Sequence, residues 1–255
     1  MHLPTHQYAL SAKSTEATDE LHVNPDVYKR QHAYNTIMEM AKAASEKGME
    51  LLGITEHAPA MPGTCHEFYF LNLKVLKRSL YGITVLFGAE ANIMDYNGKL
   101  DLREGILKKM DLVIASLHIP CLKPGTKEEN TRAYLKAMEN PYVNVIGHPD
   151  DSRYPIDYEA LVKGAKEHHI LLELNNNSLN PEGGRENPLP NDLEMLKLCK
   201  EYQVPIVINS DAHWIDDIGN HCYCDSVIEA VDFPEELIVN RSVEEIKKYL
   251  NYYKR

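Results

Sequence analysis

The sequence has no long hydrophobic run and no export signal of the usual kind. No stretch of about 18 consecutive apolar residues occurs, which argues against a membrane-spanning helix. Residues 1–20 lack the basic stretch and apolar core of a secretion signal. We therefore expect a cytoplasmic protein with no membrane partner.

Positive charge is also scarce. The chain has 27 Lys and Arg against 38 Asp and Glu, for a net charge of −11 over 255 residues. Such a field repels phosphate backbones, so a nucleic-acid-binding surface is not expected. It also repels a small phosphorylated substrate, unless bound cations reverse the sign of the local potential.

Cysteine is too scarce and too irregularly spaced for a disulfide framework. The five cysteines are Cys65, Cys121, Cys199, Cys222 and Cys224, an odd number that fits a reducing compartment. Cys222 and Cys224 form a C-x-C pair, which is a weak metal motif. We interpret this pair as plain thiols.

What the chain does contain is a regular alternation of helical and strand patterns from residue 35 onward. Hydrophobic residues make up 44% of the sequence, enough for a sizeable core. Helical periodicity is predicted over residues 35–47, 130–138, 158–168, 192–202 and 242–253. Short apolar runs occur at residues 51–55, 83–89, 112–116, 143–146, 170–174 and 205–209.

This alternation predicts the class of fold. Short apolar runs between helices are typical of buried parallel strands in βα units. Gly48 is placed to end the first helix, and Asn191 and Asp192 offer an N-cap to a later one. Residues 180–191, rich in Pro and Gly, are predicted to form a surface loop. Because six or seven units follow one another with no linker, we predict an α/β fold with one closed or nearly closed barrel. A doubly wound open sheet is the alternative.

Histidine and carboxylate side chains follow the apolar runs at the same end. The residues are His57, Glu90, His118, His148, Asp211 and His213. In an α/β barrel the carboxyl ends of all strands open on one face, so these side chains are expected to converge there. Imidazole and carboxylate groups suit zinc, manganese or iron, which predicts a shared metal site. His2, His6, His22, His66, His168, His169 and His221 lack this placement, and we interpret most of them as surface residues.

Motifs for covalent catalysis are missing. The sequence has no nucleophile elbow, no P-loop and no G-x-G-x-x-G pattern. A hydrolase that uses a metal-activated water is the simplest prediction.

Taken together, these segments resemble the PHP (polymerase and histidinol phosphatase) family, and within it the YcdX-type phosphatases. The matching stretches are HAYNT (32–36), GITEHAP (53–59), GAEANI (88–93), ASLHIP (115–120), GHPDD (147–151), LELNNNS (172–178) and NSDAH (209–213). The resemblance implies a distorted barrel of seven βα units, with a phosphoesterase domain over residues 32–255. It also implies a trinuclear metal centre, with zinc as the expected metal and manganese or iron as alternatives.

The resemblance assigns a role to each candidate ligand. Glu90, His118 and His148 would hold one metal. Glu90 would bridge to a second metal, which Asp211 also binds, and these two carboxylates are the predicted catalytic residues.

The remaining assignments from the resemblance concern the third metal and the mouth of the site. The third metal would be held by His32, His57 and His213. Glu173 and residues 175–177 would lie at the mouth, where they support the ligands or orient the substrate. His66 or Arg153 would lie near the mouth as well.

The start of the chain departs from the family pattern. Family members begin with a strand that ends in D-x-H-x-H shortly before the position of His32, and those two histidines bind the second metal. Here residues 24–31 read NPDVYKRQ, with no histidine. Residues 1–31 show no apolar period of a strand or helix. We therefore expect the first strand to be missing and segment 1–31 to be disordered or non-native.

The hexapeptide DVYKRQ (26–31) offers a reason. The DNA sequence GAT GTG TAT AAG AGA CAG encodes it, and that DNA resembles the transposon-end adapter used in sequencing-library preparation. We favour the hypothesis that a read artefact has replaced the natural N-terminus. The alternative is a natural, divergent N-terminus in which Glu20, Leu21 and His22 are a degenerate remnant of D-L-H.

The predicted function is metal-dependent hydrolysis of phosphate monoesters, with a small phosphorylated substrate as the partner. Histidinol-phosphate hydrolysis is the same chemistry with a dedicated pocket. A polymerase-associated nuclease domain is disfavoured by the acidic charge. Because the D-x-H-x-H ligands are missing, a folded scaffold with an incomplete metal centre stays open for this chain, and so does a homo-oligomer.

Overall fold

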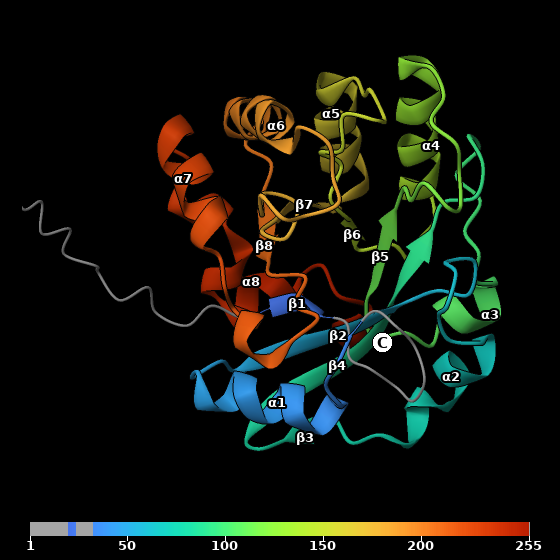
Figure 1. The fold of residues 1–255 in the computed structure, drawn as a ribbon, viewed down its shortest axis with the longest axis vertical. Coiled ribbons are helices and arrows are strands. Elements are labelled where there is room, and N and C mark those ends of the chain that lie inside the picture. The colour runs from blue at the N-terminus through green and yellow to red at the C-terminus, as the bar shows by residue number, and fades with distance from the viewer. Residues whose placement is uncertain (1–19, 24–32, 255) are drawn as a thin grey trace, which may run out of the picture.

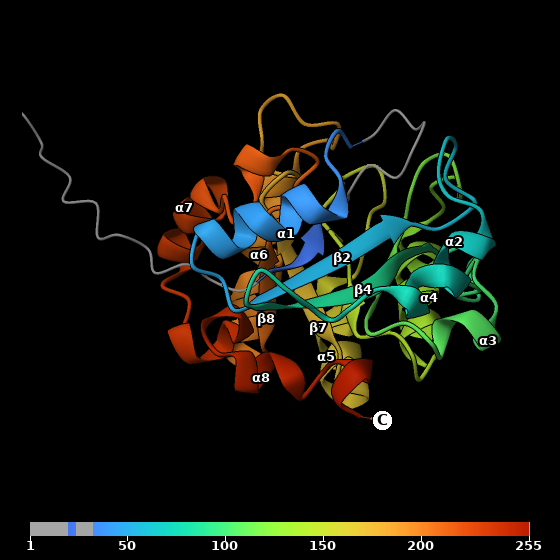
Figure 2. The ribbon, with the colours of Figure 1, turned by 90° about the horizontal axis from the view of Figure 1, so that it is seen from below.

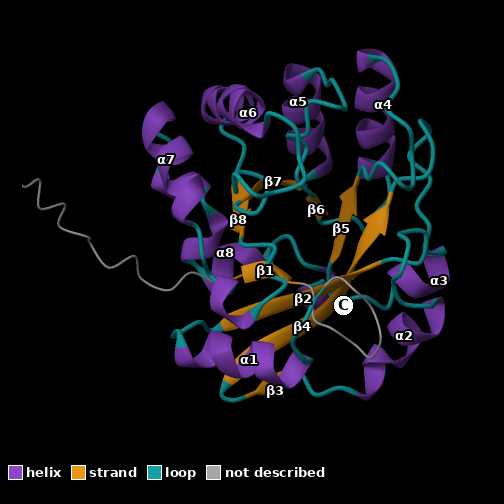
Figure 3. Ribbon diagram, in the orientation of Figure 1, coloured by secondary structure: helices purple, strands orange, loops and turns teal. Residues whose placement is uncertain are grey.

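One curled sheet forms the centre of the molecule (Figures 1 and 3). The structure, a computed structural model, describes residues 20–23 and 33–254. The strands are β1 (Glu20–Val23), β2 (Leu51–His57), β3 (Ser79–Leu80), β4 (Ile83–Asn92), β5 (Val113–Ser116), β6 (Val145–Ile146), β7 (Leu171–Asn175) and β8 (Ile206–Asn209). None of the helices in the described ranges is long and apolar enough to cross a membrane.

The order of the strands defines the fold as a barrel. The sheet runs β1-β2-β4-β5-β6-β7-β8, all parallel, and the short β3 pairs antiparallel with β4. β1 also contacts β8, so the first and last parallel strands come together as the sheet curls (Figure 1). A doubly wound sheet reverses its strand order partway, so that alternative is wrong. The predicted α/β fold, a distorted barrel, is confirmed.

Helices cover the outside of the curled sheet. They are α1 (Ile37–Glu46), α2 (Glu67–Asn72), α3 (Glu104–Leu107), α4 (Lys127–Met138), α5 (Tyr158–His168), α6 (Pro188–Tyr202), α7 (Cys222–Val231) and α8 (Val243–Lys247). α4, α5, α6 and α7 pack side by side in chain order, as the two views in Figures 1 and 2 show. Thr36 and Thr126 begin α1 and α4 with capping boxes, and Gly48, with φ +82°, follows α1 as predicted.

The strand residues that face the barrel interior are apolar near the strand starts and polar near the carboxyl ends. Residues two apart on a strand face the same side. The apolar members near the strand starts form one buried cluster with the C-terminal segment, made of Leu51, Leu86, Leu112, Ile114, Val145, Leu171, Val207, Val239, Ile246, Tyr249 and Leu250. On the same faces but closer to the carboxyl ends lie polar residues, such as Glu90 four positions after Leu86.

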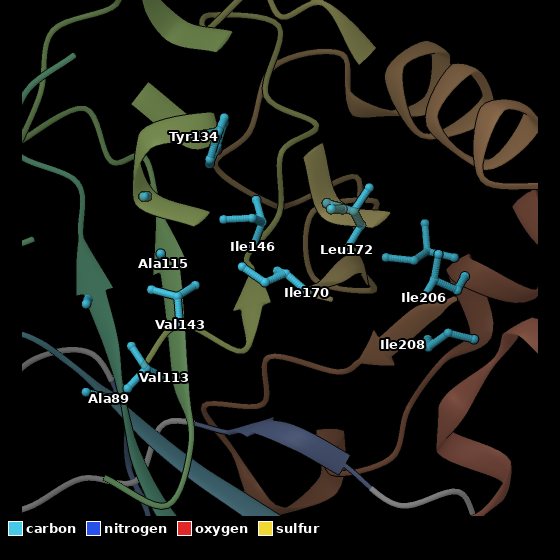
Figure 4. Packing of buried hydrophobic residues seen from close by; sticks show 14 of the residues in the cluster. Ala89, Val113, Ala115, Tyr134, Val143, Ile146, Ile170, Leu172, Ile206 and Ile208 are labelled. Atoms are coloured by element: carbon cyan, nitrogen blue, oxygen red, sulfur yellow. The ribbon is translucent and has the colours of Figure 1, made fainter. Parts of the chain in front are cut away.

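The other face of each strand packs against the helices. Figure 4 shows Ala89, Val113, Ala115, Ile146, Leu172 and Ile206 in this layer, with Tyr134 of α4 close by. Apolar packing therefore holds the strands on both faces at their starts. The polar carboxyl ends are positioned by this rigid frame, although they contribute little apolar packing of their own.

The first strand of the barrel is present, and the expectation that it is missing is wrong. β1 pairs with β2 in parallel, with Glu20 opposite Leu52 and Val23 opposite Ile54. The sequence shows no apolar alternation here because a strand of only 4 residues is too short for one. Its contacts with β2 and β8 position it instead. The remainder of segment 1–31, DVYKRQ included, lies outside the described residues, so the replaced N-terminus stays a hypothesis.

The start of α6 also differs from the prediction. The helix begins at Pro188, inside the segment predicted to be a surface loop, and Asn191 and Asp192 lie within its first turns instead of capping it. Proline fits this position because the first N–H groups of a helix have no intrahelical partner.

The C-terminal helical pattern is broken into two pieces. α8 ends at Lys247, and residues Asn251–Tyr253 form a separate 3-10 turn. The backbone between them bonds to the barrel instead: Asn144 donates from its side chain to the Tyr249 oxygen at 2.7 Å. Tertiary hydrogen bonds therefore override helical periodicity here.

Candidate metal centre

The polar residues at the carboxyl ends of the strands meet around one buried carboxylate, Glu90 of β4. His57 Nδ1, at the end of β2, lies 2.6 Å from Glu90 Oε2. His118 Nε2, after β5, lies 3.1 Å from Glu90 Oε1, and His148 Nε2, after β6, lies 2.8 Å from the same oxygen. Imidazoles from the ends of β2, β5 and β6, on both sides of β4, therefore contact one carboxylate.

This donor set fits a divalent metal. One ligand atom from each of His57, Glu90 and His118 lies within 4.8 Å of the other two. Nitrogen and carboxylate oxygen are the donors that zinc prefers when it is not bound by thiolates. A fully buried carboxylate is costly unless positive charge compensates it, so cations among these residues would account for its placement.

The pKa values of His57 and His118 are shifted in opposite directions. Burial lowers the pKa of His118 to about 4, against the opposing effect of Glu90. Burial also acts to lower the pKa of His57, but the Glu90 carboxylate outweighs it and the net pKa is raised. Because neutral imidazole is the metal-binding form, burial favours that form in His118, whereas the Glu90 carboxylate favours the protonated form of His57.

The loop after β8 adds Asp211 and His213. Asp211 Oδ2 accepts a hydrogen bond from Asn175 Nδ2 at 3.3 Å. His213 Nδ1 lies 2.7 Å from the backbone oxygen of Asp211, which assigns the proton to Nδ1 and the metal-binding lone pair to Nε2. Both residues line the same cavity as His57 and His118. The structure thus brings the predicted strand-end residues to one end of the barrel, and their role as ligands stays a prediction.

The contacts group the residues in a way that the family resemblance did not. His57 touches Glu90 directly, although the resemblance placed it with His32 and His213 at a third metal. His32 lies outside the described residues. The division of the ligands among three metals therefore stays a prediction.

Glu173 supports the site from beneath instead of lying at its mouth. It is fully buried, and its Oε2 accepts from the backbone N–H of His148 at 2.8 Å. Asn175 Nδ2 donates to the same oxygen at 3.1 Å, and Asn209 Nδ2 donates to Oε1 at 2.8 Å. Glu173 and Asn175 are therefore buried hydrogen-bonding groups that hold the ends of β6, β7 and β8 together. They do not line the cavity, but their contacts agree with the predicted role of supporting the ligands.

Asn176 and Asn177 do line the cavity. Asn176 has a second role, because its Oδ1 accepts from the backbone N–H of Tyr223 at 2.9 Å at the start of α7. Of the two residues suggested near the mouth, Arg153 lines the cavity and His66 does not. The His66 ring nitrogen caps α2 by accepting from Phe68 N at 3.2 Å. His221 is half-buried, and burial lowers its pKa to about 4.

A cavity of about 750 Å³ opens beside the cluster. Two arginines, Arg153 and Arg185, are among its lining residues. Arg153 donates from Nε and Nη2 to the Asp151 carboxylate at 2.9 and 2.5 Å, so its charge is largely engaged. Arg185, which sequence reasoning missed inside a loop rich in Gly and Pro, has its Nε 3.8 Å from Asp150 Oδ1.

The cysteines take no part in the cluster. All five are free thiols, and within the C-x-C pair Cys222 is exposed while Cys224 is buried. The interpretation of this pair as plain thiols stays a prediction.

The chain is an α/β barrel protein with histidines and carboxylates gathered at the carboxyl ends of its strands, the face where active sites of such barrels form. The chain belongs to the PHP family, since the PHP domain model matches residues 20–177. The match includes β1, which lies before residue 32.

Curated relatives match most of the chain. A protein of Clostridium novyi named "Probable phosphatase" is 50% identical over 219 residues, covering 86% of this chain and 89% of the relative. A "Probable phosphatase" of Caldicellulosiruptor saccharolyticus is 47% identical over 222 residues, covering 87% and 92%.

Solved structures share the fold at low identity. The histidinol phosphate phosphatase of Lactococcus lactis, solved with zinc, L-histidinol and phosphate, has a TM-score of 0.58 at 18% identity and covers 86% of this chain and 95% of its own. A chain in the structure of archaeal ribonuclease P with mature tRNA has a TM-score of 0.56 at 20% identity, covering 92% of this chain and 89% of its own.

Proposed function

We propose that the chain is a metal-dependent phosphatase that hydrolyses phosphate monoesters of small molecules. The observation that carries the proposal is the buried contact of Glu90 with His57, His118 and His148, beside a cavity large enough for a small substrate. The names of the relatives at 50% and 47% identity support the same activity.

The chain's own residues would have distinct roles in this reaction. Bound metals would supply positive charge for the phosphate oxygens and acidify a water molecule. Glu90 and Asp211 would set the charge of the centre, and the histidines would fix its geometry. With a net charge of −11, the protein needs such local positive charge to admit an anionic substrate.

Arg185 is the side chain best placed to bind the phosphate group. It lines the cavity, and its Nε lies 3.8 Å from the buried Asp150 carboxylate. Burial acts to lower its pKa, but the carboxylates of Asp150, Asp211 and Glu90 raise it above its usual value. Arg185 is therefore a permanent cation close to the cluster, and the planar guanidinium suits phosphate oxygens.

Zinc is the metal we propose, in three sites as the family resemblance implies. The zinc-bound L. lactis structure supports this choice, and manganese or iron are the alternatives. Histidinol phosphate is the alternative substrate, supported by the name of the same fold neighbour. A cytoplasmic location and a small-molecule partner, with no nucleic acid and no membrane, are part of the proposal.

The test is a substrate panel with metal analysis. The purified chain would be stripped with a chelator, reloaded with zinc or manganese, and assayed for phosphate release. The panel would hold p-nitrophenyl phosphate, its bis-ester, histidinol phosphate and several sugar phosphates. We expect metal-dependent cleavage of monoesters in preference to the diester. Cleavage confined to histidinol phosphate would select the alternative substrate, and no metal uptake would leave only the scaffold interpretation.

A further inference from the structure

A chain of hydrogen bonds runs from a carboxylate, through an amide, to the imidazole of His118. His118 Nδ1 lies 2.7 Å from Asn92 Oδ1. Asn92 Nδ2 in turn donates to Asp101 Oδ2, also at 2.7 Å. Asn92 is the last residue of β4, two positions after Glu90, and Asp101 follows the loop of residues 93–100.

The Asn92 amide is held in one orientation. A side-chain amide has two N–H donors and one oxygen acceptor. Both donors are engaged, one by Asp101 Oδ2 and the other by the backbone oxygen of Ala58 at 3.2 Å. The amide oxygen must therefore face His118, where it accepts from Nδ1.

This orientation decides the tautomer of His118. With its proton on Nδ1, the ring presents the lone pair of Nε2, and Nε2 is the atom 3.1 Å from Glu90 Oε1 in the cluster. The opposite tautomer would place an N–H where a metal must bind. The hydrogen bond from Nδ1 also fixes the angle of the ring.

Asp101 ties together the strand ends that carry the cluster. Its Oδ1 accepts from the backbone N–H of Asn92 at 2.8 Å, and its Oδ2 accepts from Ala60 N at 2.9 Å. Ala60 lies three residues after His57, and Asn92 two residues after Glu90. One carboxylate thus satisfies three donors around the ends of β2 and β4.

We propose that Asp101 is a positioning residue for the metal centre, which acts through Asn92 to hold His118 with Nε2 directed at the metal. Asp101 does not touch the cluster in this role. The inference needs a metal at His118 but no particular substrate, so it goes beyond the proposed phosphatase activity. Groups behind a metal-bound histidine typically change metal affinity by about 10–100-fold when they are removed.

The first test compares Asp101→Asn with Asp95→Asn in the full chain. Asparagine at 101 offers one acceptor oxygen to three donors, so the Asn92 amide loses its fixed orientation. Asp95 is a matched control in the same loop: its Oδ1 accepts from Asn97 N at 2.8 Å and Lys99 N at 3.2 Å, away from His118. We expect zinc affinity, measured by chelator competition, to fall about 10–100-fold in Asp101→Asn and to change little in Asp95→Asn.

The second test reads the tautomer directly, without metal. Nitrogen-15 shifts of the histidine rings, with His118 assigned by its loss in His118→Gln, report which nitrogen carries the proton. We expect Nδ1–H in the parent and in Asp95→Asn, and a mixture of tautomers in Asp101→Asn and in Asn92→Ala. Asn92→Ala covers the case in which Asp101→Asn does not fold.

The two readouts separate the possible failures. A protein that binds zinc but shows equal affinity and an unchanged His118 tautomer in Asp101→Asn and Asn92→Ala would overturn the positioning role. A parent chain that binds no metal would defeat the proposed function, and the tautomer would still decide the role of Asp101. Equal losses of affinity in Asp101→Asn and Asp95→Asn would reduce Asp101 to a residue that only stabilises its loop.

Discussion

Two residues of the candidate site, His148 and Asp211, have left-handed backbone conformations, with φ of +31° and +52°. For residues with a Cβ this conformation is strained and is usually kept where a side chain must be aimed. Both lie two residues past the end of a parallel strand, β6 or β8, so the strained turn redirects the chain close to where the strand leaves the sheet. We interpret the strain as the cost of pointing both side chains into the barrel mouth.

Gly147 allows the approach of His148. A Cβ at this position would lie 2.4 Å from Ser116 Oγ and 2.7 Å from Ile114 Cγ2. We expect Gly147→Ala to destabilise the fold by about 1–3 kcal/mol through overpacking, and to weaken metal binding by displacing His148. Urea unfolding and chelator competition would measure the two effects.

Gly184→Ala is the control for that substitution, because a Cβ there would meet nothing within 4 Å. It should leave stability almost unchanged. If the two variants unfold at the same urea concentration, the close packing at Gly147 is not significant.

Arg185 and Arg153 line the same cavity but differ in how their charge is engaged. We expect Arg185→Ala to lower kcat/KM for a phosphomonoester by about 10–100-fold, the loss of a charged hydrogen bond of about 1.5–3 kcal/mol. Arg153→Ala should cost much less, because that guanidinium is bound to Asp151. Steady-state kinetics of both variants check the difference, and a larger loss in Arg153→Ala would reassign the phosphate-binding role.

Glu90 should matter more than His32 if it bridges two metals. Glu90→Gln keeps the shape of the side chain but removes the charge that offsets repulsion between the cations. We expect a greater loss of both kcat and metal content in Glu90→Gln than in His32→Ala, which removes one ligand of one metal. The comparison belongs in a version of the chain with a family N-terminus, and equal losses would show that Glu90 is not a bridge.

At the scale of elements, strands with apolar runs could be predicted, whereas short elements could not. The strand runs were located to within a few residues because burial on both faces leaves a continuous apolar signal, as in β4. α2 and α3 span only 6 and 4 residues, too few for helical periodicity to show. β1 was missed because it too is short, with only 4 residues. Its pairing with β2 positions it in the sheet, although its own sequence shows no strand pattern.

The strand β1 leads to a truncation experiment. Deleting residues 1–23 removes its ladder with β2, whereas deleting residues 1–19 leaves it in place. Backbone hydrogen bonds contribute about 0.5–1.5 kcal/mol each, so the longer deletion should lower the free energy of unfolding clearly more than the shorter one. Chemical unfolding followed by circular dichroism measures both, and identical stabilities would argue that Glu20–Val23 does not belong to the barrel.

At the scale of the whole molecule, the candidate ligands were easier to predict from the sequence than the residues that surround and position them. Ligand-type residues such as His57 and Glu90 stand directly after apolar runs, and the barrel rule places them on one face. Asp101 and Arg185 come from loops, where nothing in a single sequence indicates what they touch. Glu173 was assigned to the mouth because its strand position was known but its side-chain partners were not.

The chain as a whole should be a poor phosphatase. If the family ligand sets apply and His22 of β1 supplies no ligand, the second metal keeps only Glu90 and Asp211, because residues 24–31 contain no histidine. Catalytic zinc normally has three protein ligands and a water, so this ion should be weakly held while the other sites still bind metal. We therefore expect retained metal and much reduced turnover of p-nitrophenyl phosphate.

Grafting a family N-terminus that ends in D-x-H-x-H in front of His32 should restore both the missing ligands and the turnover. Metal content per chain and kcat, measured side by side for the original and the grafted chain, test this. His22 tests the alternative of a natural, divergent N-terminus. It lies in β1, a strand that runs toward the mouth in parallel with β2. If the original chain is as fast as the grafted one, and His22→Ala then abolishes activity, the N-terminus is natural and His22 supplies a ligand. If His22→Ala has no effect, the second metal is dispensable.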